Sequence, residues 1–240
     1  MNELAFTSWT ESTWVGFDTE TTGVNPNEDL LVTASLVLLA EGVKGDLSQV
    51  ETANWLADPG VEIPEVAAQV HGISTEQARA EGRPLGEVCG EVAERIVDLW
   101  RSGAILVGFN LAYDIRILEH SLEVCGLTSL EERAGGYGPM VDPLVWDRKL
   151  EPYRRGRRNL ETLCGVYEVS LDDRFHQADV DALATLGVLA AMVALYPSVR
   201  TLGREELTDY TAAAHQAWAE QFNRYLASQG RDANVEEYWP

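Results

Sequence analysis

The first third of the chain alternates between short apolar runs and clusters of turn-forming residues. Segments that contain Gly, Asn and Pro separate the runs, which are rich in Val, Leu and Trp. The runs occupy residues 14–18, 30–40 and 50–56. Three consecutive strands with short connections predict an antiparallel meander.

The spacing of the apolar positions then lengthens to that of a helix. Over residues 84–102, five apolar side chains share one face: Leu85, Val88, Val92, Ile96 and Leu99. Further helices are predicted over residues 64–70, 74–80, 112–125, 159–167, 179–195 and 204–228. Two more strands are predicted over residues 104–109 and 140–146. This order of elements predicts an α/β fold, in which helices flank a mixed five-stranded sheet.

The length and apolar content fit one domain with an extension. The chain has 240 residues, of which 45% are hydrophobic, and we divide it into residues 1–198 and 199–240. In the extension, Trp218, Phe222 and Tyr225 share one helix face. Either this face docks onto the domain's own core or it binds a partner. The last ten residues are predicted to be loosely ordered.

Charge and cysteine content restrict the class of protein. A net charge of −21 argues against a general basic surface for nucleic acid, so any such activity needs metal ions or a local basic patch. Cys89, Cys125 and Cys164 form no Cys-x-x-Cys motif and are predicted to be buried free thiols. The apolar runs 30–40 and 183–195 are shorter than a membrane span. We therefore predict a soluble, cytoplasmic protein without a membrane partner.

The first strand ends in two acids. Asp18 and Glu20 alternate with Thr19, so both point to one face of the strand. Two half-buried carboxylates on one face repel each other unless a cation lies between them. Thr21, Thr22 and Gly23 follow directly. Because the chain has 39 acidic residues, the Asp-x-Glu tripeptide alone is uninformative, and its place at the end of a buried strand supports half of a metal site.

Two other places could complete that site. Asp114 lies in the first turn of the helix after strand 104–109, where the helix dipole alone would favour an acid. His176, Asp179 and Asp181 lie at the start of the apolar helix 179–195. Asp179 would serve as a helix cap by itself, whereas Asp181 lies within a helix that heads toward the core.

Three motifs together resemble the DEDDh family of 3′→5′ exonucleases. They are Asp18-Thr19-Glu20-Thr21-Thr22-Gly23, Asn110-Leu111-Ala112-Tyr113-Asp114 and His176-x-Ala178-x-x-Asp181. Residues 70–74 and 142–169 are similar to segments found among relatives of the DNA polymerase III epsilon subunit, which proofreads. The resemblance covers residues 12–196, and residues 197–240 lie outside it.

The resemblance implies an RNase H-like fold and a set of roles. Asp18, Glu20, Asp114 and Asp181 would hold two Mg²⁺ or Mn²⁺ ions, and His176 would deprotonate the attacking water. The residues expected near the terminal nucleotide are Thr21, Thr22, His71 and Asn110.

A basic cluster precedes the helix at 159–167. It supplies six of the 18 basic residues, namely Arg148, Lys149, Arg154, Arg155, Arg157 and Arg158. Either the cluster contacts phosphates, through Arg155 and Arg158, or it is a solvated loop.

These features predict a metal-dependent 3′→5′ exonuclease that acts on the 3′ ends of single-stranded DNA. Two alternatives stay open. One is an exoribonuclease of the same family, and the other is an accessory subunit that recruits a DNA polymerase through residues 204–240.

Overall fold

A computed structural model describes residues 8–170 and 178–240. Its centre is one mixed sheet with the strand order β4-β3-β2-β1-β5-β6. The strands are β1 (Trp14–Thr21), β2 (Leu31–Leu39), β3 (Glu51–Asp58), β4 (Arg83–Pro84), β5 (Ile105–Val107) and β6 (Met140–Val141). β1, β2 and β3 pair antiparallel, while β5 is parallel to β1 and β6 is parallel to β5. The predicted mixed sheet and meander are confirmed, but the predicted strand count is wrong, because the two-residue β4 adds a sixth strand.

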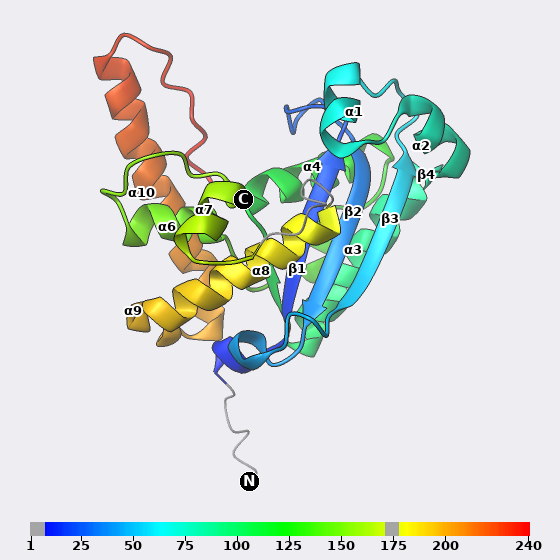
Figure 1. Ribbon diagram of the computed structural model, residues 1–240. Coiled ribbons are helices and arrows are strands. Elements are labelled where there is room, and N and C mark those ends of the chain that lie inside the picture. The colour runs from blue at the N-terminus through cyan, green and yellow to red at the C-terminus, as the bar shows by residue number, and fades with distance from the viewer. Residues whose placement is uncertain (1–7, 171–177) are drawn as a thin grey trace.

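Helices cover both faces of the sheet (Figure 1). The α-helices are α1 (Glu65–His71), α2 (Thr75–Glu81), α3 (Leu85–Ser102), α4 (Leu111–Val124), α5 (Leu130–Ala134), α6 (Pro143–Leu150), α7 (Leu160–Val166), α8 (Ala178–Leu195), α9 (Pro197–Arg200) and α10 (Leu207–Ser228). Three short 3₁₀ helices are η1 (Trp9–Glu11), η2 (Gly42–Lys44) and η3 (Arg204–Glu206). In Figure 1, α8 crosses in front of β1, and α3 lies behind the sheet.

The alternation of side chains along β1 separates the two cores. Val15 and Phe17 join the core beneath α3 and α4. Trp14 joins the opposite core, which contains α8. Because side chains alternate between faces, Asp18 and Glu20 lie on the α8 side of the sheet. The predicted common face of these two acids follows from this register.

One prediction about local structure is wrong. Residues 140–146, predicted as a strand, form the two-residue β6 and then the start of α6. Asp142 stops the strand, because its carboxylate accepts hydrogen bonds from the N–H groups of Leu144 and Val145, and Pro143 suits the first turn of a helix. After α8 ends at Leu195, Pro197 begins the short helix α9.

The C-terminal extension packs against the rest of the protein. Helix α10 lies on α6 and β6, and the Trp146 indole donates a hydrogen bond of 2.8 Å to the Thr211 hydroxyl. The segment after α10 turns back toward the helix. The Asn223 side chain donates a hydrogen bond to the carbonyl of Val235 and accepts one from its N–H. Trp239 is only 7% exposed and belongs to the core beneath α3. The prediction of loosely ordered final residues is therefore wrong.

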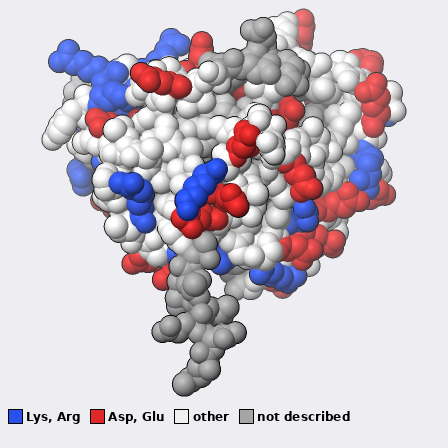
Figure 2. All heavy atoms as spheres, turned by 60° about the horizontal axis from the view of Figure 1, so that its bottom comes forward, with Lys and Arg blue, Asp and Glu red and all other residues white. Residues whose placement is uncertain are grey.

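Helix α8 is long and apolar enough to cross a membrane, by length and composition only, yet most of it is buried inside the protein. This helix includes Asp179 and Asp181 in its first turn, and the apolar run 183–195 that follows them is shorter than a span, as predicted. Of the three free thiols, those of Cys89 and Cys164 are buried and that of Cys125 is half-buried. On the face shown in Figure 2, basic and acidic side chains are interspersed without a broad basic surface.

Candidate active site

A close approach of β1 and α8 brings three acids together. A Cβ atom on Gly16 would lie 2.8 Å from the carbonyl oxygen of Ala182, so only glycine allows α8 to pack this closely. Asp181 directly precedes Ala182, and Asp18 and Glu20 lie further along the same face of β1. The glycine therefore determines how near Asp181 comes to the two acids of the strand.

The fourth acid comes from the first turn of α4. Asp114 is 3% exposed, and its Oδ1 accepts hydrogen bonds from the Thr19 N–H at 3.0 Å and the Thr19 hydroxyl at 2.6 Å. The Thr19 side chain lies on the opposite face of β1 from Asp18 and Glu20. Its bonds to Asp114 therefore connect the strand to α4. Oδ2 of Asp114 is not used by these bonds.

A second buried acid fixes the start of α4. Asp142 accepts hydrogen bonds from the N–H groups of Asn110 at 3.2 Å and Leu111 at 3.0 Å. The same carboxylate caps α6. Asn110 has a left-handed backbone with φ of 64°, a conformation that asparagine tolerates better than most residues. Asp142 was not predicted as a functional residue, although its place before Pro143 was a signal for a helix cap.

The acids raise one another's pKa. Loss of hydration raises the pKa of Glu20 to about 8, and the charges of Asp181 and Asp114 add to this shift. Loss of hydration also raises the pKa of Asp18 well above its ordinary value, helped by Asp114, Glu20 and Asp181. Burial raises the pKa of Asp114 to about 7, against the opposing hydrogen bonds from Thr19. The four carboxylates thus form one electrostatic cluster drawn from β1, α4 and α8.

The donor set fits hard divalent cations. Within residues 8–170 and 178–240, no three Asp, Glu, His or Cys side chains are gathered as tightly as metal ligands would be. The carboxylates nevertheless act on one another, because burial and then the charges of neighbouring acids raise the pKa values of Asp18 and Glu20. Carboxylate oxygens are the ligands that Mg²⁺ and Mn²⁺ prefer. His176, the predicted general base, lies outside the described residues.

A pocket adjoins Glu20 on the side of β2 and β3. It has a volume of about 350 Å³, and its lining includes Glu20, Asn54, Trp55, His71 and Asp179. The His71 Nδ1 accepts a hydrogen bond from the N–H of Ile73. Its buried Nε2 has no hydrogen-bond partner among the described residues. Burial lowers the pKa of His71, and the nearby Thr21 backbone partly opposes that shift. A ligand in the pocket could therefore use this nitrogen.

The two threonines after Glu20 are engaged by the protein. The Thr21 hydroxyl donates to the carbonyl of Gly23 at 2.5 Å and lies 2.8 Å from the Tyr113 hydroxyl. The Thr22 hydroxyl donates to Asp29 at 3.0 Å. These bonds shape the turn after β1 and connect it to α4. Contact of either residue with a nucleotide stays a prediction.

The basic cluster divides into three groups. Arg154 and Arg158 form ion pairs with Asp147, whose side chain is fully buried. The Arg148 guanidinium lies 3.6 Å from the centre of the Trp218 ring, and the Lys149 ammonium lies over Tyr210. Arg155 and Arg157 are exposed. Arg158 is thus turned toward the protein interior, and the cluster is neither one phosphate-binding patch nor one solvated loop.

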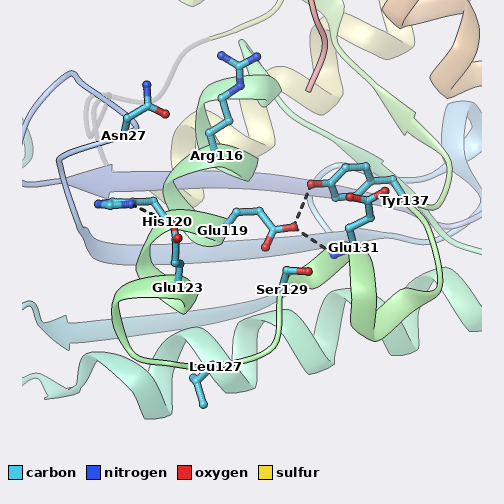
Figure 3. Close-up of a pocket in the computed structure, with 9 residues that line it drawn as sticks. All are labelled: Asn27, Arg116, Glu119, His120, Glu123, Leu127, Ser129, Glu131 and Tyr137. Carbon is cyan, nitrogen blue, oxygen red and sulfur yellow. Dashed lines mark hydrogen bonds and ion pairs between the residues drawn. The ribbon is translucent and has the colours of Figure 1, made fainter.

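Another hollow, of about 660 Å³, has none of these acids in its lining (Figure 3). Its floor carries Glu119, which accepts hydrogen bonds from the Tyr137 hydroxyl at 2.9 Å and the Glu131 N–H at 3.1 Å. The N–H of Leu130 bonds the second oxygen of the same carboxylate. Glu119 therefore connects α4 to α5 and serves a structural purpose.

Comparisons with known proteins agree on the family. The model of the family described as "Exonuclease" matches residues 15–189. A DNA polymerase III of the PolC type from Lacticaseibacillus paracasei is 27% identical over 179 residues, which are 75% of this chain and 11% of the polymerase. The corresponding polymerase of Streptococcus thermophilus is 30% identical over 176 residues, again 11% of its length. The chain thus spans about a tenth of these relatives.

Solved structures support the fold. Exonuclease I of Methylocaldum szegediense superposes with a TM-score of 0.62 at 18% identity, covering 89% of this chain and 46% of that one. E. coli exonuclease I in complex with a dA16 oligonucleotide gives a TM-score of 0.60 at 19% identity, covering 85% and 44%. The family match includes β1 from Val15 onward, all of α4, and α8 as far as Leu189. These are the three elements that carry the acids. This chain belongs to the exonuclease family.

Proposed function

We propose that this protein is a metal-dependent 3′→5′ exonuclease that removes nucleotides from the 3′ end of single-stranded DNA. The convergence of Asp18, Glu20, Asp114 and Asp181 carries the proposal. Three separate elements hold four carboxylates that raise one another's pKa. Such an arrangement is unfavourable in a fold unless cations bind to it.

The four acids would hold two Mg²⁺ or Mn²⁺ ions, which when bound stabilise the attacking and leaving oxygens at phosphorus. The two Thr19 bonds orient Asp114 through Oδ1, and Oδ2 would bind a cation. His176 is the proposed general base for the attacking water. The pocket lined by Glu20 and His71 would take the terminal nucleotide, with the His71 Nε2 as a donor or acceptor.

DNA is the proposed substrate for two reasons. The relatives are DNA polymerases, and an exonuclease I structure of the same fold contains a deoxyoligonucleotide. A DNA polymerase is accordingly a proposed partner, and a cytoplasmic location fits three free cysteines.

The test uses a 5′-labelled single-stranded DNA and a matched RNA, each incubated with Mg²⁺, with Mn²⁺ and with EDTA. We expect a ladder that shortens from the 3′ end, requires metal and forms faster on DNA. Asp18→Asn should abolish the ladder while the protein stays folded. Asp98→Asn, on the exposed face of α3, is the matched control and should cut normally.

Other outcomes would change the proposal in defined ways. Faster cleavage of RNA would make the protein an exoribonuclease. A folded wild-type protein that cuts neither strand would contradict the enzyme proposal. An Asp18→Asn variant that keeps most of its activity would contradict the assignment of the acids.

A further inference from the structure

A small pocket lies between the start of α4, the end of α6 and the C-terminal extension. Its volume is about 230 Å³, and its lining includes Tyr113, Arg116, Arg148, His215, Trp218 and Tyr238. Figure 1 shows how this arrangement arises, since the segment after α10 returns toward α6 and α4. The pocket combines two cations with exposed or half-exposed rings in a chain that is otherwise strongly acidic.

Arg148 is unusual among the arginines of this region. Its guanidinium lies against the Trp218 ring at 3.6 Å. It makes no hydrogen bond and no ion pair with any residue that the structure describes, although burial lowers its pKa and the charges of Asp142 and Asp147 oppose that shift. Arg154 and Arg158, in the loop after α6, both pair with Asp147. A half-buried guanidinium with unused N–H groups is suited to an anion, and phosphate matches its planar fork.

A second cation stands at the other side of the pocket. Arg116 donates one hydrogen bond of 2.9 Å to the carbonyl of Tyr238, and it forms no ion pair within the described ranges. The Tyr238 side chain is 78% exposed. The Tyr238 backbone is held in place by this bond and by the neighbouring Trp239, which is buried in the core. Tyr238 thus offers an exposed ring beside two arginines and Glu236, whereas the Trp218 ring is already in contact with Arg148 and stacked on Phe222 at 5.4 Å.

The pocket adjoins the proposed catalytic centre. Tyr113 lines the pocket, directly precedes Asp114, and contacts the Thr21 hydroxyl at 2.8 Å. The pocket beside Glu20 and His71 has a separate lining formed by β1, β2, β3, α1 and α8. If the 3′ end of a DNA strand occupied the Glu20 pocket, the strand would pass Asp114. Nucleotides further toward its 5′ end would then reach Arg148.

We propose that this pocket is a subsite for single-stranded DNA on the 5′ side of the cleaved nucleotide, an inference that rests on the proposed function. Arg148 and Arg116 would contact backbone phosphates. Tyr238 would stack on a base, as aromatic platforms do in proteins that bind single strands without sequence preference, and Trp218 would position the Arg148 guanidinium. The C-terminal extension would thereby contribute to substrate binding.

Binding can be measured apart from cleavage. Asp18→Asn protein is titrated into 5′-fluorescent oligodeoxythymidylate of about twelve nucleotides, with Mg²⁺ present, and anisotropy is recorded at several salt concentrations. Adding Arg148→Gln should weaken binding roughly tenfold and reduce the salt slope by about 1. Arg95→Gln, which removes an exposed arginine on α3 outside both pockets, is the matched control and should change affinity little.

A second variant tests the ring. Tyr238→Leu should weaken binding of the normal strand about tenfold and leave binding of a strand with abasic sites nearly unchanged. With catalytically intact protein, Arg148→Gln should raise KM for the long strand and not for a dinucleotide, which is too short to reach the pocket. Melting temperatures of all variants establish that they are folded.

Three results would overturn the subsite. They are equal effects of Arg148→Gln and Arg95→Gln, an equal loss with the dinucleotide, and a loss seen only with RNA. The two proposals fail separately. If the protein binds DNA through Arg148 but never cuts it, the proposed activity is rejected and the subsite is kept. If the protein cuts DNA and Arg148→Gln changes neither binding nor cleavage, the subsite is rejected and the activity is kept.

Discussion

Gly16 offers a test of the catalytic geometry that leaves every acid in place. Gly16→Ala would bring a Cβ atom to 2.8 Å from the Ala182 carbonyl oxygen. Nonbonded heavy atoms prefer separations of about 3.5 Å or more, so strand and helix must separate by roughly 0.7 Å. Asp181 moves with α8, and a displacement of this size at reacting groups costs up to about 10²-fold in rate.

We therefore expect Gly16→Ala to lower kcat/KM on single-stranded DNA by about 10- to 100-fold. The free energy of unfolding should fall by about 1–3 kcal/mol, as for other overpacked cores. Activity is measured at saturating Mn²⁺, and stability by urea denaturation. Gly165→Ala is the matched control, because a Cβ there meets nothing within 4 Å. Full activity in Gly16→Ala, or the same loss in Gly165→Ala, would refute the reasoning.

Three other predictions concern the acids. The folded pKa of Glu20, about 8, lies above its ordinary 4.5, so metal-free protein should lose stability as pH rises between these values. Its melting temperature in EDTA should fall by several degrees over this range and recover with Mn²⁺, whereas a melting temperature that does not change with pH would contradict the cluster. Thr19→Val removes the 2.6 Å bond to Asp114 and should lower kcat/KM about 10- to 100-fold, whereas an unchanged metal titration and rate would show that this bond does not position the acid. Asp147→Ala leaves two guanidinium groups without their buried partner and should lower the free energy of unfolding, measured in urea, by about 3–5 kcal/mol. A loss below about 1 kcal/mol would indicate that solvent replaces the ion pairs.

Much of the fold could be predicted from local periodicity. The meander, the long helix over residues 85–102 and the apolar helix α8 all carry clear patterns of period two or 3.6. The failures have local causes that compete with periodicity. Residues 140–146 are apolar enough for a strand, but the Asp142 cap and Pro143 favour a helix. β4 has only two residues, and no pattern can reveal a strand of that length.

The acids of the site could be identified from sequence motifs, but their arrangement could not. Alternation along β1 predicts the common face of Asp18 and Glu20. The contact of Thr19 with Asp114 joins residues 95 positions apart, and the approach of Gly16 to Ala182 depends on tertiary packing. The functions of Asp142 and Asp147 escaped prediction for a similar reason, because an acid in an apolar helix shows its partners only after folding.

The division of the basic cluster explains how a protein of net charge −21 could still bind a polyanion. At physiological salt, exposed charges act over only about 8 Å, so the total charge matters less than the cations that adjoin the site. Asp147 pairs with both Arg154 and Arg158, and these residues hold the loop between α6 and α7. Arg148 and Arg116 form no ion pair with a described residue and lie beside α4, whose first turn carries Asp114. In the proposed subsite, attraction for phosphate would be concentrated where a strand enters, while the acidic remainder of the surface would disfavour binding elsewhere.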